Sequence, residues 1–285
     1  MSLSISRLEL EVGRAYPLGY TQYLPEVKPV KAMLISSATA VYQDYYKKFA
    51  QYFAQQGLVT YTFDYSGFGA SGNTIDHLKT HRGGMISWGA IDQKAMVELI
   101  HKNHPKLKLV LVTHSIGGQI MGFNPLNGLF EKVLMVASQS GYWKIYSGQD
   151  RLRLWLFWHF FIPVFTPFFG YYPGKSIGIV DNLPSSVVTE WRKWGLKKEY
   201  FMHFYNETEY YFEQLRVPMR MYSFTNDQFA SKKGVDWLGK QYKNAKVERI
   251  HFDRGSNNKR PGHFGFFKEE FEEALWKSTL DWLTT

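Results

Sequence analysis

Residues 107–119 read LKLVLVTHSIGGQ, and this stretch decides the fold. Leu107–Thr113 is the most hydrophobic strand pattern in the chain, as expected of a strand buried on both faces of a sheet. It continues directly into Ser115 and two glycines, which predicts a tight turn from strand to helix. A serine hydroxyl becomes a nucleophile only when the chain lifts it clear of the backbone and a base accepts its proton. The stretch therefore predicts a nucleophilic serine at the end of a central strand.

Strand and helix patterns alternate around this stretch. Further strands are expected at the N-terminus and at residues 31–36, 58–65, 132–137, 219–224 and 246–252. Helices are expected at residues 41–53, 86–103 and 269–283. Strands that alternate with helices at this spacing predict an α/β fold, with a mostly parallel sheet covered on both faces.

The alternation stops between about Tyr142 and Arg216. Phe, Tyr and Trp make up 13 of the 31 residues from 142 to 172. Because this aromatic segment lies between two expected sheet strands, it predicts an inserted helical cap. The expected organisation is one core domain, residues 1–141 and 217–285, with the cap at residues 142–216.

A strand-to-helix serine needs an acid after a later strand and a histidine later still. Asp227 follows the expected strand 219–224, and His263 follows the strand 246–252 in a glycine-flanked loop. Both lie after the C-terminal ends of strands, where open α/β sheets place their sites. The order Ser115, Asp227, His263 therefore predicts a catalytic triad.

Other acids and bases fit this order less well. His251 lies inside an expected strand, and His159 and His203 lie in the cap. Asp253 comes after the last expected strand, too late to be the acid that precedes it.

Four motifs resemble those of the α/β-hydrolase-fold serine hydrolases, in particular the bacterial group related to monoacylglycerol lipases and serine aminopeptidases. They are DYSGFGAS at 64–71, HSIGGQ at 114–119, QSGYW at 139–143 and GHFGFF at 262–267. The resemblance implies an α/β-hydrolase fold, with Ser115 as nucleophile, His263 as general base and Asp227 as its orienting acid. Two positions depart from the pattern: Thr113 stands where the turn before the serine usually has glycine, and Ser66 stands where arginine is usual.

The tetrahedral intermediate of such a reaction needs hydrogen-bond donors for its oxyanion. One is expected to be the backbone N–H of Ile116, directly after the nucleophile. The other is expected from the loop after strand 31–36, where Thr39 is the first choice and Ala38 the alternative.

Composition and spacing exclude several other classes. The chain has no cysteine, which excludes disulfides, cysteine zinc sites, iron–sulfur clusters and thiol catalysis. Its net charge of +9 is concentrated in residues 101–200, which argues against a chain-wide nucleic-acid surface. Gly67, Gly69 and Gly72 are interpreted as a turn and not as a dinucleotide site, because no helix pattern starts at them. His77 and His81 have a zinc-like spacing but lack the accompanying glutamate and lie in an expected loop. No cofactor and no metal is expected.

Residues 154–172 contain no Asp, Glu, Lys or Arg, and at 19 residues they approach the length of a membrane span. Pro163 and Pro167 are expected to break a helix there, which argues against a span. Peripheral contact with a lipid surface, helped by Arg151, Arg153 and Lys175, stays open. The N-terminus lacks the apolar core of a signal peptide, so a cytoplasmic protein is expected.

These observations predict a serine hydrolase that cleaves a carboxylic ester through an acyl-enzyme. The aromatic cap favours a small-molecule ester with an apolar acyl or aryl group, and Trp143, Trp155 and Trp158 are expected to bind it. Amide hydrolysis and acyl transfer would use the same residues. A non-catalytic ligand-binding protein on a hydrolase scaffold is the alternative from another class.

Overall fold

The computed structural model describes residues 3–72, 74–178, 180–255 and 258–285. An eight-stranded sheet has the order β1-β2-β4-β3-β5-β6-β9-β10. Its strands are β1 (Leu3–Leu10), β2 (Leu18–Pro25), β3 (Lys31–Ser36), β4 (Leu58–Phe63), β5 (Leu109–His114), β6 (Phe130–Val136), β9 (Pro218–Phe224) and β10 (Lys246–Phe252). The pairs β1–β2 and β2–β4 are antiparallel, and the other pairs are parallel. The mostly parallel sheet is as predicted, although the sequence patterns did not reveal β2.

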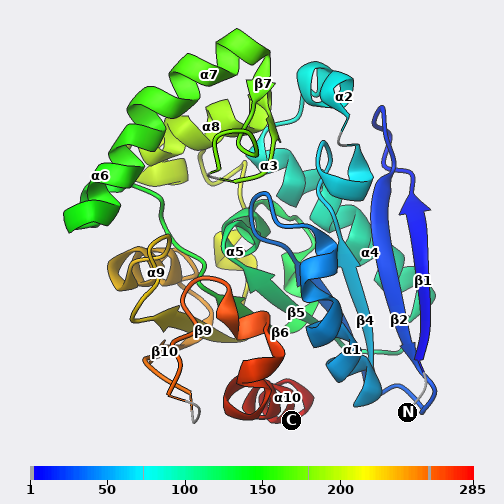
Figure 1. Cartoon of the computed structure of the whole chain (residues 1–285). Coiled ribbons are helices and arrows are strands. Elements are labelled where there is room, and N and C mark those ends of the chain that lie inside the picture. The colour runs from blue at the N-terminus through cyan, green and yellow to red at the C-terminus, as the bar shows by residue number, and fades with distance from the viewer. Residues whose placement is uncertain (1–2, 73, 179, 256–257) are drawn as a thin grey trace.

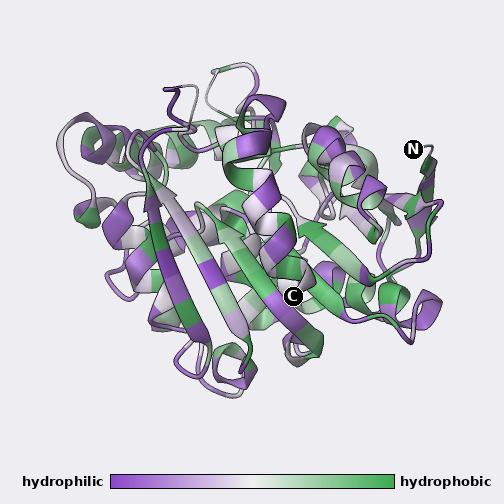
Figure 2. Cartoon of the chain, turned by 90° about the horizontal axis from the view of Figure 1, so that it is seen from below, coloured by the Kyte–Doolittle hydropathy of each residue, from purple (hydrophilic) through white to green (hydrophobic). Residues whose placement is uncertain are grey.

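Helices cover both faces of this sheet (Figure 1). They are α1 (Lys47–Gln55), α2 (Ile75–Thr80), α3 (Met85–Ser87), α4 (Lys94–Asn103), α5 (Ile116–Ile120), α6 (Gly148–Leu156), α7 (Ile162–Phe169), α8 (Ser185–Gly195), α9 (Lys232–Gly239) and α10 (Lys277–Thr284). The π-helical segment Trp88–Gln93 joins α3 to α4, so the helix expected at 86–103 is continuous. In Figure 2, seen from below, the helix that ends at the C-terminus lies across the strands with alternating hydrophilic and hydrophobic residues.

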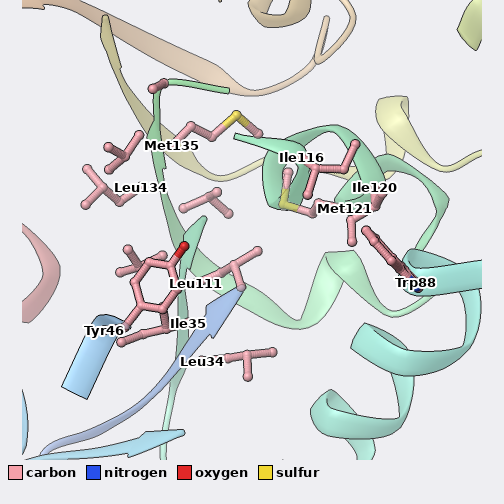
Figure 3. Packing of buried hydrophobic residues seen from close by; sticks show 14 of the residues in the cluster. Leu34, Ile35, Tyr46, Trp88, Leu111, Ile116, Ile120, Met121, Leu134 and Met135 are labelled. Carbon is pink, nitrogen blue, oxygen red and sulfur yellow. The ribbon is translucent and has the colours of Figure 1, made fainter. Parts of the chain in front are cut away.

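The core lies on both sides of the central strands. Every residue of β3, β4 and β5 is buried, because parallel strands in the middle of a sheet contact helices on each face. Figure 3 shows Tyr46 on one side of these strands and Trp88, with Ile120 and Met121, on the other.

The cap segment contributes no strand to the eight-stranded sheet in the residues that the structure describes. Helices α6, α7 and α8 gather beyond one end of the sheet, away from the chain termini (Figure 1). A short antiparallel pair, β7 (Tyr171–Tyr172) and β8 (Leu183–Pro184), lies between α7 and α8.

The prediction that prolines break the helix in residues 154–172 is wrong. A single helix runs from Gly148 to Phe169 through Pro163 and Pro167. A proline ring clashes with the carbonyl group four residues earlier in a regular α-helix. For Pro163 that carbonyl belongs to His159, which lies in the π-helical turn Phe157–Phe161, where the backbone is wider.

The segment around His77 is also more regular than predicted. The sequence pattern predicts a loop here, but Ile75–Thr80 forms the short helix α2. Thr74 caps this helix, since its side chain accepts a hydrogen bond from the His77 N–H.

Ser66, which stands where the resemblance places arginine, binds a buried carboxylate. Its backbone N–H and its hydroxyl donate to Asp92 at 2.8 and 3.0 Å. Arg14, from the connection between β1 and β2, lies 3.4 Å from the same carboxylate. Burial raises the pKa of Asp92 to about 6, although Arg14 and Ser66 oppose this change. The guanidinium of Arg14 therefore lies near the turn at Ser66, the position where the resemblance places an arginine.

Candidate active site

Ser115 lies on a sharp turn between β5 and α5. Its backbone has φ 51° and ψ −112°, a conformation that a residue with a side chain rarely adopts. Its N–H donates to the Val136 carbonyl at 2.9 Å. A side chain at Gly117 would place its Cβ 2.5 Å from the Ser36 carbonyl oxygen, so only glycine allows β3 to approach this closely. The structure therefore places Ser115 on a strained elbow at the end of the central strand.

Thr113 fits into this elbow although glycine is usual there. The residue is fully buried, and its hydroxyl lies 3.3 Å from that of Ser138. A Cβ atom at Gly118 would lie 2.9 Å from Thr113 Oγ1 and 2.4 Å from Ser138 Oγ. Gly118 thus leaves the space that the threonine side chain occupies.

His263 and Asp227 form a buried pair beside the elbow. His263 Nδ1 lies 2.8 Å from Asp227 Oδ2 and 3.0 Å from Oδ1. A carboxylate only accepts hydrogen bonds, so Nδ1 carries the proton and Nε2 is free to act as a base. Asp227 Oδ1 also accepts the N–H groups of Phe229 and Ala230, each at 2.8 Å. These two backbone donors hold the carboxylate in one orientation.

Ser115 and His263 line the same cleft, which has a volume of about 580 Å³. Within the described residues no hydrogen bond joins their two side chains. Catalytic hydrogen bonds are often long in ligand-free sites and shorten when substrate binds. The geometry therefore allows the serine and the base to meet around a bound substrate.

The cleft walls are mainly apolar and come from both core and cap. Cap residues in the lining include Leu154, Phe157, Trp158, Phe161, Val180 and Trp191. Phe229 and Phe264 contribute from the loops that carry the acid and the base. One polar corner contains Asp150, Arg153 and Gln228, in which Arg153 contacts both of the other side chains.

Of the three tryptophans predicted to bind substrate, the structure brings only Trp158 to the cleft. Trp155 is partly exposed and stacks on His159, and Trp143 contacts the edge of the same ring. Neither of these two residues lines the cleft, because Trp155 lies on the exposed side of the cap helix and Trp143 lies in a short turn before that helix begins. Trp191 on α8 was missed, since an aromatic count cannot tell which face of a cap helix meets the cleft.

The loop after β3 lies next to the elbow because β3 and β5 are parallel neighbours, with Ser36 opposite Thr113. The N–H of Ala38 donates to the Tyr46 hydroxyl at 2.9 Å and is therefore occupied. Thr39 lines the cleft, and its N–H has no partner among the described residues. Ile116 is the first residue of α5, so its N–H has no acceptor within the helix. Of the two residues considered in this loop, the geometry favours Thr39 over Ala38.

Among the described residues, no group of three His, Asp or Glu side chains is arranged to hold a metal ion. The cleft brings together the Ser115 hydroxyl and the His263–Asp227 pair.

Solved structures with low sequence identity share the architecture of the chain. A thermostable carboxyl esterase from Bacillus coagulans matches with a TM-score of 0.68 and 10% identity, over 99% of this chain and 98% of that one. A soluble variant of monoglyceride lipase from Saccharomyces cerevisiae matches with a TM-score of 0.70 and 11% identity, over 99% and 94%. The chain has the α/β-hydrolase fold.

Sequence comparisons match a narrower part of the chain. The family model described as serine aminopeptidase, S33, matches residues 27–122, which include β3, β4, β5 and the elbow. A monoacylglycerol lipase from Mycolicibacterium smegmatis is 28% identical over 102 residues. That match spans 36% of this chain and only 35% of the relative. The predicted resemblance is confirmed.

Proposed function

We propose that this α/β-hydrolase cleaves a carboxylic ester through an acyl-enzyme, with Ser115 as nucleophile, His263 as general base and Asp227 as its orienting acid. The observation that carries the proposal is the strained Ser115, in one cleft with an imidazole whose Nε2 is free. The names of the relatives, an esterase and two lipases, support an ester substrate.

The first half of the reaction forms the acyl-enzyme. His263 Nε2 takes the proton of Ser115 as the serine oxygen attacks the ester carbonyl. The N–H groups of Ile116 and Thr39 stabilise the charge that develops on the carbonyl oxygen. His263 then donates its proton to the departing alcohol, while Asp227 stabilises the transient imidazolium.

The second half releases the acid. Water takes the place of the alcohol, and His263 removes its proton as it attacks the acyl carbon. The tetrahedral intermediate collapses, Ser115 recovers its proton from His263, and the carboxylic acid leaves. Amidases and acyltransferases could use the same residues, but the mainly apolar cleft favours an ester with an apolar acyl group over a peptide.

Residues 142–216 form the cap in this proposal, and the cap has two roles. It closes the cleft over the acyl group, and it brings the protein into peripheral contact with a lipid surface. The support for lipid contact is helix Gly148–Phe169, which by length and composition alone could cross a membrane. A cytoplasmic location stays a prediction.

Specificity is expected to rise with acyl chain length until the cleft is full. Each methylene group buried gains about 0.8 kcal/mol, so kcat/KM should rise up to about fourfold per carbon. The measurement is kcat/KM for esters with two to twelve acyl carbons. Phe161→Ala, which enlarges the cleft, should move the optimum to longer chains.

The matched control is Phe160→Ala on the outer face of the same helix, which should leave the optimum unchanged. The result that would contradict this prediction is a wild-type kcat/KM that stays flat or falls with acyl chain length, with the same profile in both variants. It would show that the cleft does not hold the acyl chain.

A further inference from the structure

Exposed apolar residues occur along the outer face of the cap helix from Leu152 to Phe168. Leu152, Phe160, Val164 and Phe168 are exposed, and their spacing places them on one face of the helix that spans Gly148–Phe169. The exposed fraction of Phe168 is 83%. Only 22% of the apolar window of this helix is buried. We call the four residues the outer stripe.

The inner face of the same helix is apolar too. Leu154, Phe157, Trp158 and Phe161 point into the cleft or the core. A surface helix of a water-soluble protein normally has one apolar face and one polar face. Exposed apolar patches on such proteins mark sites of contact with a partner or a membrane. The outer stripe therefore needs an apolar environment that the chain itself does not supply.

Cations flank the outer stripe at both ends. Arg151 is exposed at the N-terminal end of the helix, whereas Arg153 lines the cleft, where it pairs with Asp150. At the other end, the side chain of Lys79 runs past Gly170, and Lys175 is exposed nearby in sequence. Between them, residues 154–172 contain no charge. Lys and Arg side chains beside an apolar helix face suit the phosphate groups of anionic lipids.

We propose that the outer stripe docks on an anionic lipid surface, with the helix lying in the plane of the interface. The helix is tied to the rest of the protein from its inner face, where Trp158 Nε1 donates to the Gly141 carbonyl and Arg192 Nε donates to the Trp158 carbonyl. Crossing the membrane would break these bonds. A second copy of the chain fits less well, because a two-fold pairing of antiparallel helices would bring the cations at their ends together.

This proposal rests on the lipid contact assigned to the cap in the proposed function. Vesicle binding tests it without any ester turnover, so its failure is distinguishable from a failure of the proposed ester cleavage. The wild-type protein should co-sediment with vesicles of phosphatidylcholine and phosphatidylglycerol, and less with phosphatidylcholine alone. The double variant Phe160→Ser with Phe168→Ser should lose at least about tenfold in partition coefficient, because it removes two exposed phenyl rings that would be buried in the lipid. The variant Arg151→Gln with Lys175→Gln should lose only the preference for anionic vesicles.

The matched control replaces two exposed apolar residues of the edge strand β1, Ile5→Ser with Leu8→Ser, and should bind like the wild type. Equal losses in the control and the stripe variant would overturn the proposal, as would absence of vesicle binding by the wild type. A concentration-dependent dimer that the stripe variant abolishes, without vesicle binding, would assign the stripe to a second copy instead.

A series of buried hydrogen bonds lies behind the cleft. The N–H of Ala38 lies 2.9 Å from Tyr46 Oη, which lies 2.8 Å from His114 Nδ1. On its other side, His114 Nε2 lies 2.8 Å from the backbone oxygen of His263. Tyr46 and His114 are both fully buried.

Only one direction of donation satisfies all three contacts. The His263 carbonyl accepts, so His114 carries its proton on Nε2. Burial lowers the pKa of His114 well below its usual value, so the ring is neutral and Nδ1 accepts. The Tyr46 hydroxyl therefore donates to Nδ1 and accepts from the Ala38 N–H. These hydrogen bonds connect the loop that contains Ala38 and Thr39 with His114 before the elbow and with the loop that contains His263.

We infer that Tyr46 and His114 are positioning residues, which hold the oxyanion donors and His263 at the correct distance from Ser115. This inference rests on the proposed function. Tyr46→Phe removes only the hydroxyl, and it should lower kcat roughly ten- to a hundredfold with KM unchanged, because small displacements of catalytic groups are costly. The rate at which a fluorophosphonate labels Ser115 should fall in parallel.

Tyr61→Phe is a matched control. Tyr61 is also fully buried, and its hydroxyl contacts Gln22 at 2.7 Å and a histidine, His104, at 2.9 Å, in a different part of the sheet. Both variants should lose similar thermal stability, but Tyr61→Phe should keep its kcat. Unchanged kcat and labelling in Tyr46→Phe, or an equal loss of kcat in Tyr61→Phe, would overturn this inference but not the proposed function. A wild-type protein that is neither labelled nor active would overturn the proposed function with it.

Discussion

Ser115→Ala is expected to lose ester turnover by a factor on the order of a millionfold, the loss typical when a nucleophilic serine is removed. It should also lose covalent labelling by a fluorophosphonate. The proposed reaction has no other nucleophile, because the hydroxyl of Ser115 is the group that the elbow presents to the cleft. The fold should persist, since alanine replaces serine in the same backbone conformation without a larger side chain. Steady-state kinetics and mass spectrometry of the labelled peptide measure both effects.

Ser138→Ala is the matched control for this experiment. Ser138 is fully buried beside the elbow, and its hydroxyl contacts Thr113. Its replacement should cost about 1 kcal/mol of stability while turnover and labelling at Ser115 continue. Wild-type turnover in Ser115→Ala would refute the assignment of the nucleophile and the proposed acyl-enzyme.

Asp227→Asn should lower kcat on the order of a thousandfold or more, while substrate binding changes little. The N–H groups of Phe229 and Ala230 require an acceptor, so the amide oxygen of the new side chain should take the place of Oδ1. The amide NH₂ then faces His263 Nδ1, which must accept instead of donate. The ring is driven to the tautomer with a proton on Nε2, and it can no longer accept the proton of Ser115. Kinetics of kcat and KM, with circular dichroism as a check of folding, measure this effect.

Asp253→Asn is the comparison for the acid. Asp253 follows the last strand, is exposed and pairs with Arg254 and Arg260. We expect this variant to keep nearly all its activity. The reverse result, with Asp227→Asn near wild type and Asp253→Asn inactive, would show that the acid is misassigned while the reaction class survives.

Sequence patterns were most accurate for the strands of the sheet, both the buried central strand β3 and the partly exposed edge strand β10. The strands expected at 31–36 and 246–252 have the same bounds in the structure as β3 and β10. The order of Ser115, Asp227 and His263 along the chain also follows from the strands that precede them, because parallel strands deliver their C-terminal loops to one edge. The structure brings Ser115 and His263 to one cleft and Asp227 to hydrogen-bond distance of His263.

Sequence patterns were least accurate in the cap. Pro163 and Pro167 predict a broken helix in residues 154–172, but one helix continues through both, and a π-helical turn accommodates the ring of Pro163. The direction of each aromatic residue depends on how this helix is rotated against the core, so Trp158 could not be distinguished from Trp155 by composition. Arg14 was not connected with Asp92, since nothing local relates residues so far apart in the chain.

The α/β-hydrolase fold and the residue types available for its chemistry can be predicted from the sequence, because hydrophobic periodicity and glycine-rich turns are local properties of the chain. Which groups are free to act depends on the tertiary structure. It occupies the Ala38 N–H and leaves that of Thr39 open, and it sets the tautomer of His114 through two partners from distant segments. It also turns one apolar face of the cap helix into the cleft and the other outward. These outcomes depend on packing between segments remote in sequence, where no local pattern applies.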